Sequence, residues 1–141
     1  MLDLDYRVLK LLYRSSKPLK VGELSKLIKL PHSTVGTCIK RLEKGNYVIY
    51  KRYHPVILSE KGTDLAIELI RHAKLMEILL IEELDLKVEE AHEESEKFNL
   101  ILSCNIINRI CKKYNHPNKS PCGEVILNSN DCFCEEIKKS K

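Results

Sequence analysis

The sequence predicts a mainly α-helical fold, in which an N-terminal winged helix-turn-helix precedes two long helices and a cysteine-containing tail. Three observations support this prediction. Helical segments occupy most of residues 3–44, a β-branched and aromatic stretch follows at residues 47–58, and helical periodicity resumes between residues 63 and 114.

The first three helices are marked by apolar residues at helical spacing and by the residues that separate them. We expect these helices at residues 3–14, 21–30 and 32–44. Pro18 lies in the first break and Pro31 ends the second helix. The segment His32-Ser33-Thr34 supplies N-cap chemistry for the third helix, whose buried face carries Val35, Ile39 and Leu42.

The hairpin and the long helices complete the chain. Residues 47–52 and 56–58 read as two strands, and Tyr53-His54-Pro55 carries turn chemistry between them. One long helix is expected from about Thr63 to Leu84, and a second from about Val88 to Tyr114. The remaining residues are loop-like and rich in Asn, Ser, Lys and Cys.

Charge is distributed unevenly along the chain. Residues 1–63 hold thirteen Lys and Arg against five Asp and Glu, whereas residues 64–100 hold four against eleven. A basic first part suggests a polyanionic partner, most simply nucleic acid. The alternative is that these lysines only solvate the helices.

Several function classes find no support in the sequence. No GxGxxG, P-loop, GxSxG or HExxH motif occurs, so we expect no enzyme. The longest aliphatic run is Ile78-Leu79-Leu80-Ile81, which cannot span a bilayer. The chain does not begin with a basic segment followed by an apolar one, so no secretory signal is recognised and a cytoplasmic location is expected.

Three helices followed by a hairpin is the order of a winged helix-turn-helix, whose third helix enters the major groove of double-stranded DNA. The first turn of that helix is small and polar, and cationic residues follow it and occupy the hairpin tip. The expected DNA-binding residues are Ser33, Thr34, Gly36, Thr37, Lys40, Arg41, Lys51, Arg52 and His54. A winged helix used only for protein contacts is the competing interpretation.

Two later segments give a more specific signal. Residues 71–80 read Arg-His-Ala-Lys-Leu-Met-Glu-Ile-Leu-Leu, and residues 89–94 read Glu-Glu-Ala-His-Glu-Glu. With the wing-to-helix junction at 58–62 and the Ser-Pro-Cys-Gly turn at 120–123, the chain resembles the diphtheria-toxin-repressor family of iron- and manganese-dependent transcriptional regulators.

The resemblance implies a domain organisation and a partner. Residues 1–62 would be the DNA-binding domain, residues 63–127 the helical dimerisation and metal-binding domain, and residues 128–141 a Cys-containing tail. The two long helices would form a homodimer. We expect the short form of the family, without the SH3-like domain of its longer members.

The resemblance also implies metal ligands, which carry over only in part. One family site uses a His, a Glu four residues later and a His on the next helix. Glu77 and His92 match the last two, Ala73 stands at the first position, and His72 lies one residue away.

The other family site uses an N-terminal Asp or Met, a Cys or Glu, a Glu and a His. Asp5 and Glu96 match the first two positions, and Asn99 and Leu100 replace the others. Iron, manganese or zinc would suit such mixed oxygen and nitrogen ligands. His92 as a partner of a half-buried Glu77, and Asp5 as a helix cap, are the alternatives.

The cysteines offer a further possibility. Cys111, Cys122, Cys132 and Cys134 could meet if the tail folds back, and four thiolates would suit zinc or an iron–sulfur cluster. No CxxC pair is present, and ordinary free thiols, or disulfides formed under oxidation, are the alternatives. Cys38, in the third helix, is expected to pack in the core.

The leading hypothesis is therefore a dimeric transcriptional repressor whose affinity for its operator is controlled by a divalent metal, iron or manganese. One alternative is the same scaffold sensing redox state or an iron–sulfur cluster through its C-terminal cysteines. Another is a non-regulatory metal-binding interaction protein. Operator, target genes and effector are not readable from the sequence.

Overall fold

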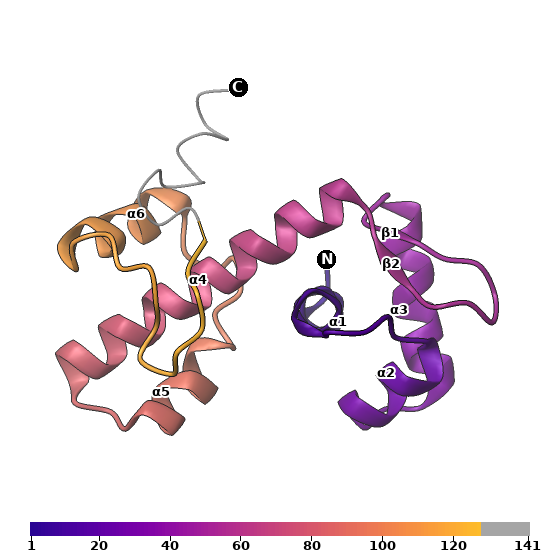
Figure 1. Cartoon of the computed structure of the whole chain (residues 1–141), viewed down its shortest axis with the longest axis horizontal. Helices are drawn as coiled ribbons and strands as arrows, with labels where there is room; N and C mark the ends of the chain where they lie inside the picture. The colour runs from indigo at the N-terminus through magenta and orange to yellow at the C-terminus, as the bar shows by residue number, and fades with distance from the viewer. Residues whose placement is uncertain (128–141) are drawn as a thin grey trace. The chain divides into compact units, whose positions relative to one another are not determined.

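The structure is a computed structural model of the chain and describes residues 1–127. It contains two compact units, Met1–Ile67 and a second that begins at Glu68 (Figure 1). The domain boundary expected from the sequence lies at residue 62, and the division between the units falls five residues later, inside a continuous helix.

The first unit opens with three helices, as predicted. They are α1 (Asp3–Arg14), α2 (Val21–Ile28) and α3 (His32–Lys44). Helix α3 begins at His32, and its N-cap is Pro31, which makes no side-chain cap. The predicted N-cap role of Ser33 and Thr34 is therefore wrong, because both residues already lie in the first turn of the helix. Apolar side chains from all three helices form the core, including Val8, Leu9, Leu24, Val35, Ile39 and Leu42.

The wing is shorter than the sequence predicts. Strand β1 (Val48–Ile49) pairs antiparallel with β2 (Ile57–Leu58), with Val48 opposite Leu58. Between them the backbone of His54 donates a hydrogen bond to the carbonyl of Lys51, and Tyr53 adopts a left-handed conformation (φ 68°). Because of this turn, residues 50–56 do not pair between the two strands and form a loop.

The long helix α4 (Glu60–Leu84) begins in the first unit and continues into the second. The hydroxyl of Ser59 accepts a hydrogen bond from the Gly62 amide at 3.0 Å, which caps the helix start. Gly62 lies so close to the wing that a Cβ there would stand 1.9 Å from the carbonyl oxygen of Tyr47. Only glycine fits this junction.

The predicted second long helix is wrong in one respect, because it is two helices, α5 (Val88–Ser95) and α6 (Cys104–Lys113). Asn99 adopts a left-handed conformation (φ 43°), which an α-helix cannot contain. Ser103 then caps α6, since its hydroxyl accepts a hydrogen bond from the amide of Ile106 at 3.4 Å. Glu96 is consequently the C-cap of α5, and Leu100 lies outside both helices.

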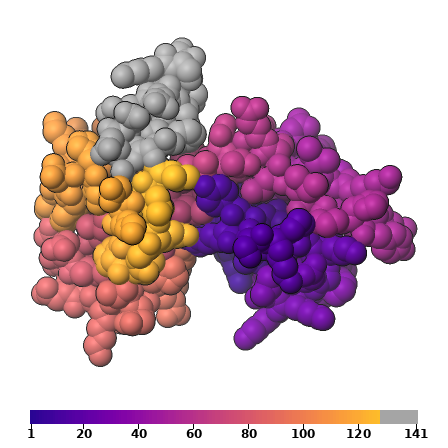
Figure 2. All heavy atoms as spheres, in the orientation of Figure 1, coloured from indigo at the N-terminus to yellow at the C-terminus, as the bar shows by residue number. Residues whose placement is uncertain are grey.

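The second unit has its own apolar core between α4 and α6. Its buried members are Leu75, Met76, Ile78, Ile107, Ile110, Cys111 and Ile126. The segment that follows α6 runs across α4 and brings Ile126 into this core. In Figure 2 the yellow residues of this segment form part of the surface of the unit. Within residues 1–127, none of the helices combines the length and the apolar character that a membrane span requires.

Candidate nucleic-acid interface and metal centre

Helix α3 has one buried face and one polar face. Val35, Cys38, Ile39 and Leu42 point into the core. Ser33, Thr34, Thr37 and Lys40 are exposed, and a Cβ added to Gly36 would meet nothing within 4 Å. This face is therefore smooth, hydroxyl-rich and open, which allows close approach of a flat or grooved partner.

Arg41 has a fixed position that the sequence did not reveal. Its Nη2 donates to Oδ1 of Asp5 at 2.7 Å, and its Nε donates to Oδ2 at 3.3 Å. The side chain of Asp5 is 2% exposed and that of Arg41 is 36% exposed. The guanidinium thus lies at the edge of α3, held by a buried carboxylate from α1.

The same carboxylate has further partners in its own unit. Oδ1 of Asp5 accepts from the thiol of Cys38 at 3.0 Å, and Oδ2 accepts from the amide of Leu2 at 3.1 Å. Burial raises the pKa of Asp5, but the hydrogen bonds from Arg41, Cys38 and Leu2 outweigh it and hold the pKa below its ordinary value of 3.8. Asp5 is therefore a structural anion in this unit, and its prediction as a metal ligand receives no support from these contacts.

Cys38 packs in the core, as the sequence analysis expects. Burial, followed by the hydrogen bond to Asp5 and the charge of that carboxylate, raises the pKa of its thiol to about 12. A thiol with such a pKa is protonated at neutral pH and is a poor nucleophile or metal ligand.

The wing adds cationic groups beside α2. Lys51, Arg52 and His54 are all exposed. A groove of about 610 Å³ lies between the wing and the starts of α2 and α3, and its lining includes Lys20, Lys26, His32, Arg52 and His54. One carboxylate, that of Glu23, also lines the groove and pairs with Lys17 at 3.4 Å. The groove is therefore basic and suits an anion such as a phosphate.

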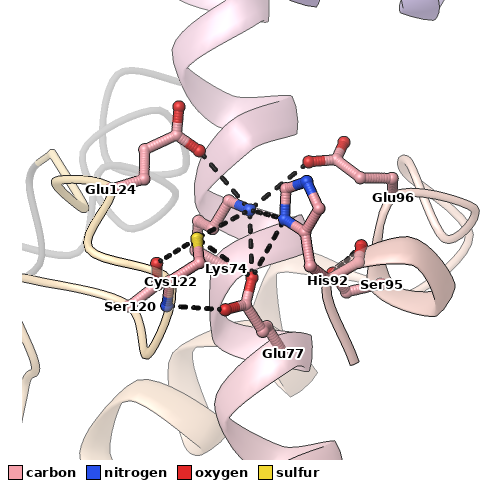
Figure 3. A network of polar contacts seen from close by, with 8 residues as sticks. All are labelled: Lys74, Glu77, His92, Ser95, Glu96, Ser120, Cys122 and Glu124. Atoms are coloured by element: carbon pink, nitrogen blue, oxygen red, sulfur yellow. Dashed lines mark hydrogen bonds and ion pairs between the residues drawn. The ribbon is translucent and has the colours of Figure 1, made fainter. Parts of the chain in front are cut away.

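The second unit brings together Glu77, His92 and Glu96, three of the predicted metal ligands, around a residue that was not predicted. The ammonium of Lys74 lies at the centre of this group, which we call the Lys74 cluster (Figure 3). Its Nζ lies 3.0 Å from Oε2 of Glu77, 2.8 Å from Nδ1 of His92, and 3.4 Å from a carboxylate oxygen of Glu96.

The chain segment after α6 completes the Lys74 cluster. Glu124 places a carboxylate oxygen 3.4 Å from Nζ, and Sγ of Cys122 lies at 3.7 Å. The amide of Cys122 donates to Oε1 of Glu77 at 3.1 Å, and the hydroxyl of Ser120 lies 3.0 Å from Sγ. Three parts of the chain thus meet at one ammonium: α4, α5 and the segment after α6 (residues 114–127), which we call the closing segment.

Lys74 and Glu77 are both fully buried. Burial lowers the pKa of Lys74, but the hydrogen bond with Glu77 and the charges of Glu96 and Glu77 outweigh it and hold the pKa above its ordinary value. The residue is therefore a cation at neutral pH. A buried cation with this many anionic partners is a structural centre, since an unpaired one would be too costly to bury.

A second cluster lies elsewhere on α4 and at the start of α6, and we call it the Glu68 cluster. Glu68 and His72 stand four residues apart on one helix face, and His72 Nε2 lies 3.7 Å from Oε1 of Glu68. The thiol of Cys104 donates to the same oxygen at 3.3 Å. Each residue offers one ligand atom, and all these atoms lie within 4.8 Å of one another.

His72 in this cluster is 1% exposed. Burial, reinforced by the charge of Arg71, lowers its pKa to about 4. Its imidazole is therefore neutral at neutral pH and keeps a lone pair, which is the form that binds metals.

The predicted four-cysteine site is represented by two described residues. Cys111 is buried in the core, and its Sγ lies 3.3 Å from Nδ1 of His116, whereas Cys122 belongs to the Lys74 cluster. Cys132 and Cys134 lie outside the described residues. The cluster of four thiolates stays a prediction.

Lys74, Glu68 and Cys104 are the functional candidates that sequence reasoning missed. A signal for Lys74 exists, because it is a lysine three residues before Glu77 within a run that is otherwise mostly apolar. Cys104 gives no such signal, since its neighbour Glu68 is 36 residues away in the sequence.

Comparison with known proteins adds two family matches and several relatives. Residues 1–49 match a winged helix-turn-helix DNA-binding model, and residues 59–128 match the model of the iron dependent repressor metal binding and dimerisation domain. An uncharacterized HTH-type transcriptional regulator of Methanocaldococcus jannaschii is 33% identical over 108 residues, which cover 75% of this chain and 86% of that protein.

Two further proteins place these matches in context. The iron-dependent repressor IdeR of Mycobacterium bovis is 32% identical over 93 residues, or 66% of this chain, but the chain spans only 40% of that repressor's length. A solved manganese-dependent transcriptional repressor in complex with manganese shares the fold, with a TM-score of 0.75 and 24% identity. That likeness covers 86% of this chain and 61% of the other.

Proposed function

This chain belongs to the diphtheria-toxin-repressor family of iron- and manganese-dependent transcriptional regulators, and we propose that it is a homodimeric repressor that binds double-stranded DNA. Its relatives are transcriptional regulators rather than enzymes. Because its proposed target is DNA, we place the protein in the cytoplasm.

The open polar face of α3 is the observation that supports DNA binding best. Thr34, Thr37 and Lys40 are exposed there, and such side chains can reach phosphates and base edges in a major groove. Arg41 is presented at the edge of the same helix by Asp5. Lys51 and Arg52 in the wing would contact a neighbouring phosphate or the minor groove.

A homodimer would place two such helices on two half-sites of an operator. Residues 59–128 match a family model that includes dimerisation, and this part of the chain exposes apolar side chains, with Ile101 77% and Ile106 42% exposed. We expect a dimer in solution, which sedimentation velocity would measure directly. A monomer at micromolar concentration would contradict this part of the proposal.

We propose further that a divalent metal ion controls the affinity for DNA, and that the Glu68 cluster holds it. Ligand atoms around a tetrahedral zinc ion stand roughly 3.3–3.6 Å apart, given metal–ligand distances of about 2.0–2.3 Å. The contacts of 3.3 Å and 3.7 Å within the Glu68 cluster are close to this spacing. A thiolate, an imidazole and a carboxylate favour iron or zinc over manganese.

An ion in the Glu68 cluster would join the middle of α4 to the start of α6. Cys104 would lose the proton that it now shares with Glu68, so binding should strengthen as the pH rises. Glu68, His72 and Cys104 would hold the ion and leave a coordination position for water or another ligand.

DNA binding is tested by fluorescence anisotropy on the DNA upstream of the protein's own gene, at several salt concentrations. We expect the affinity to fall steeply with salt, and Lys40→Ala to reduce the slope of log K against log salt by about one. Lys97→Ala is the matched control, because Lys97 is exposed in the other unit and pairs with Glu94 at 2.9 Å. Binding that is absent, or equally weakened by both variants, would contradict the assignment.

Metal control is tested by the same assay with ferrous iron, manganese, zinc or a chelator. We expect the metal to raise affinity for DNA, and His72→Ala and Cys104→Ser to remove this response while leaving metal-free binding intact. If either variant still responds to metal as wild type does, the regulatory metal does not bind at the Glu68 cluster.

A further inference from the structure

The Lys74 cluster holds the remaining predicted metal ligands of the second unit, and its centre is already a cation. We propose that the ammonium of Lys74 takes the place of a divalent metal ion in this cluster, so that α4, α5 and the closing segment are joined by a cation that cannot dissociate. The proposal concerns metal binding and is independent of DNA binding.

The hydrogen bonds show that the ligand atoms are already in use. A lysine ammonium has three donors and no acceptor, so the 2.8 Å contact makes Nδ1 of His92 the acceptor. The proton of a neutral His92 ring then lies on Nε2. The lone pair that Nδ1 would give to a metal is engaged with Lys74.

Glu77 is engaged in the same way. Its Oε2 accepts from Lys74 at 3.0 Å, and its Oε1 accepts from the amide of Cys122 at 3.1 Å. Oε2 would have to give up its hydrogen bond with Lys74 before it could bind a metal ion. The hydrogen bond from the Cys122 amide to Oε1 ties the carboxylate to the backbone of the closing segment and so sets its orientation.

Position and charge also exclude a second cation. A divalent ion that bound both Oε2 of Glu77 and Nδ1 of His92 would lie within about 2.0–2.2 Å of each. Lys74 Nζ is only 3.0 Å and 2.8 Å from these same atoms, so the two cations would be in contact and repel each other. Figure 3 shows Nζ facing all the other charged groups of the cluster.

The carboxylates explain why a cation is needed there at all. Glu77 is fully buried, and the side chains of Glu96 and Glu124 are only 21% and 29% exposed. Three carboxylates this close together would repel one another without a positive charge among them. Lys74 supplies it from within the chain, from the residue next to Ala73, where the family pattern places its metal-binding His.

The test counts metal ions bound by the full chain. We compare wild type, Lys74→Ala and Lys74→Ala/Glu77→Gln by calorimetric titration with zinc and with cobalt. We expect Lys74→Ala to bind one more ion per chain than wild type, because the substitution frees Glu77, His92 and Cys122. The double variant should lose this additional ion. Lys97→Ala, which removes an exposed lysine, should bind the same number as wild type.

Two results would overturn the proposal. The first is a folded Lys74→Ala that gains no ion, since the freed groups would then not form a metal site. The second is a wild-type chain that binds one ion fewer after His92→Ala, since an ion would then share the cluster with Lys74. This second comparison decides the matter even if Lys74→Ala does not fold.

Discussion

The pair formed by Asp5 and Arg41 allows a quantitative test of how the first unit is held together. We consider Asp5→Asn, which keeps the shape of the side chain and removes its charge. Asp5 is 2% exposed and accepts hydrogen bonds from Arg41, Cys38 and Leu2. An asparagine must place its NH₂ group against one of these donors, so at least one buried contact becomes repulsive.

The expected loss of stability follows from the burial of the two partners. Removing one member of a fully buried ion pair costs about 3–5 kcal/mol. Arg41 is 36% exposed and can turn to water, which reduces the cost to about 2 kcal/mol. For a unit of this size, a loss of about 2 kcal/mol lowers Tm by roughly 8–16 °C.

Urea unfolding followed by circular dichroism at about pH 7 measures this loss. Glu43→Gln is the control, because Glu43 is exposed on α3 and its substitution should change stability by less than about 0.5 kcal/mol. If Asp5→Asn destabilises the chain no more than this control does, the buried carboxylate does not stabilise the first unit.

The pH dependence gives a second check. Because the pKa of Asp5 is held below its ordinary value of 3.8, its ionised form stabilises the folded chain above that pH. The difference between wild type and Asp5→Asn should therefore be constant near neutral pH. It should shrink as the pH falls below 3.8 and through the lower pKa of the folded state. A difference that grows on acidification would contradict the assigned charge state.

Three further predictions follow from single positions. Thr37→Glu should weaken DNA binding at least about tenfold, because the new carboxylate repels phosphate. Urea unfolding should be unchanged, since residue 37 is exposed. If the variant binds DNA as tightly as wild type, α3 does not contact the DNA. Gly62→Ala should destabilise the first unit by about 2 kcal/mol or more in urea unfolding, because its Cβ would collide with the Tyr47 carbonyl. Gly36→Ala, where a Cβ meets nothing within 4 Å, should cause no loss of stability. Similar effects of the two substitutions would be inconsistent with the structure. In timed alkylation, Cys38 should react only after unfolding, because it is buried and burial raises its pKa to about 12. Cys122 is exposed and should react in the folded chain. Early labelling of Cys38 would show that its pocket opens.

Helical periodicity predicted most of the elements because it is a local property. The ranges of α1 and α3 follow from apolar spacing, from the Ser15-Ser16-Lys17-Pro18 break after α1, and from Pro31 immediately before α3. The break between α5 and α6 escaped this reasoning. It is marked by the left-handed conformation of Asn99 and by the Ser103 cap, and neither residue excludes a continuous helix from the sequence alone.

The family resemblance assigned Glu77 and His92 to one metal site and Glu96, together with Asp5, to another. In the structure Glu77, His92 and Glu96 all contact the same ammonium, that of Lys74. The resemblance could not show what lies between them. Lys74 stands three residues before Glu77 in a mostly apolar run, but a lysine on a helix is usually solvated, and the sequence does not show which groups cover it. Its burial depends on α5 and on the segment after α6, whose contacts with it come from 18 to 50 residues away.

The sequence by itself determined the order of helices, the basic first part and the polar surface of α3, since spacing, charge and turn residues act locally. Only the tertiary structure decided which charges meet. Asp5 binds Arg41 across 36 residues, and Lys74 pairs with Glu96 and Glu124 from distant segments as well as with Glu77 on its own helix. Such pairings arise because a folding chain cannot bury a charge without a partner, and the partner is whatever group the packing of the helices delivers.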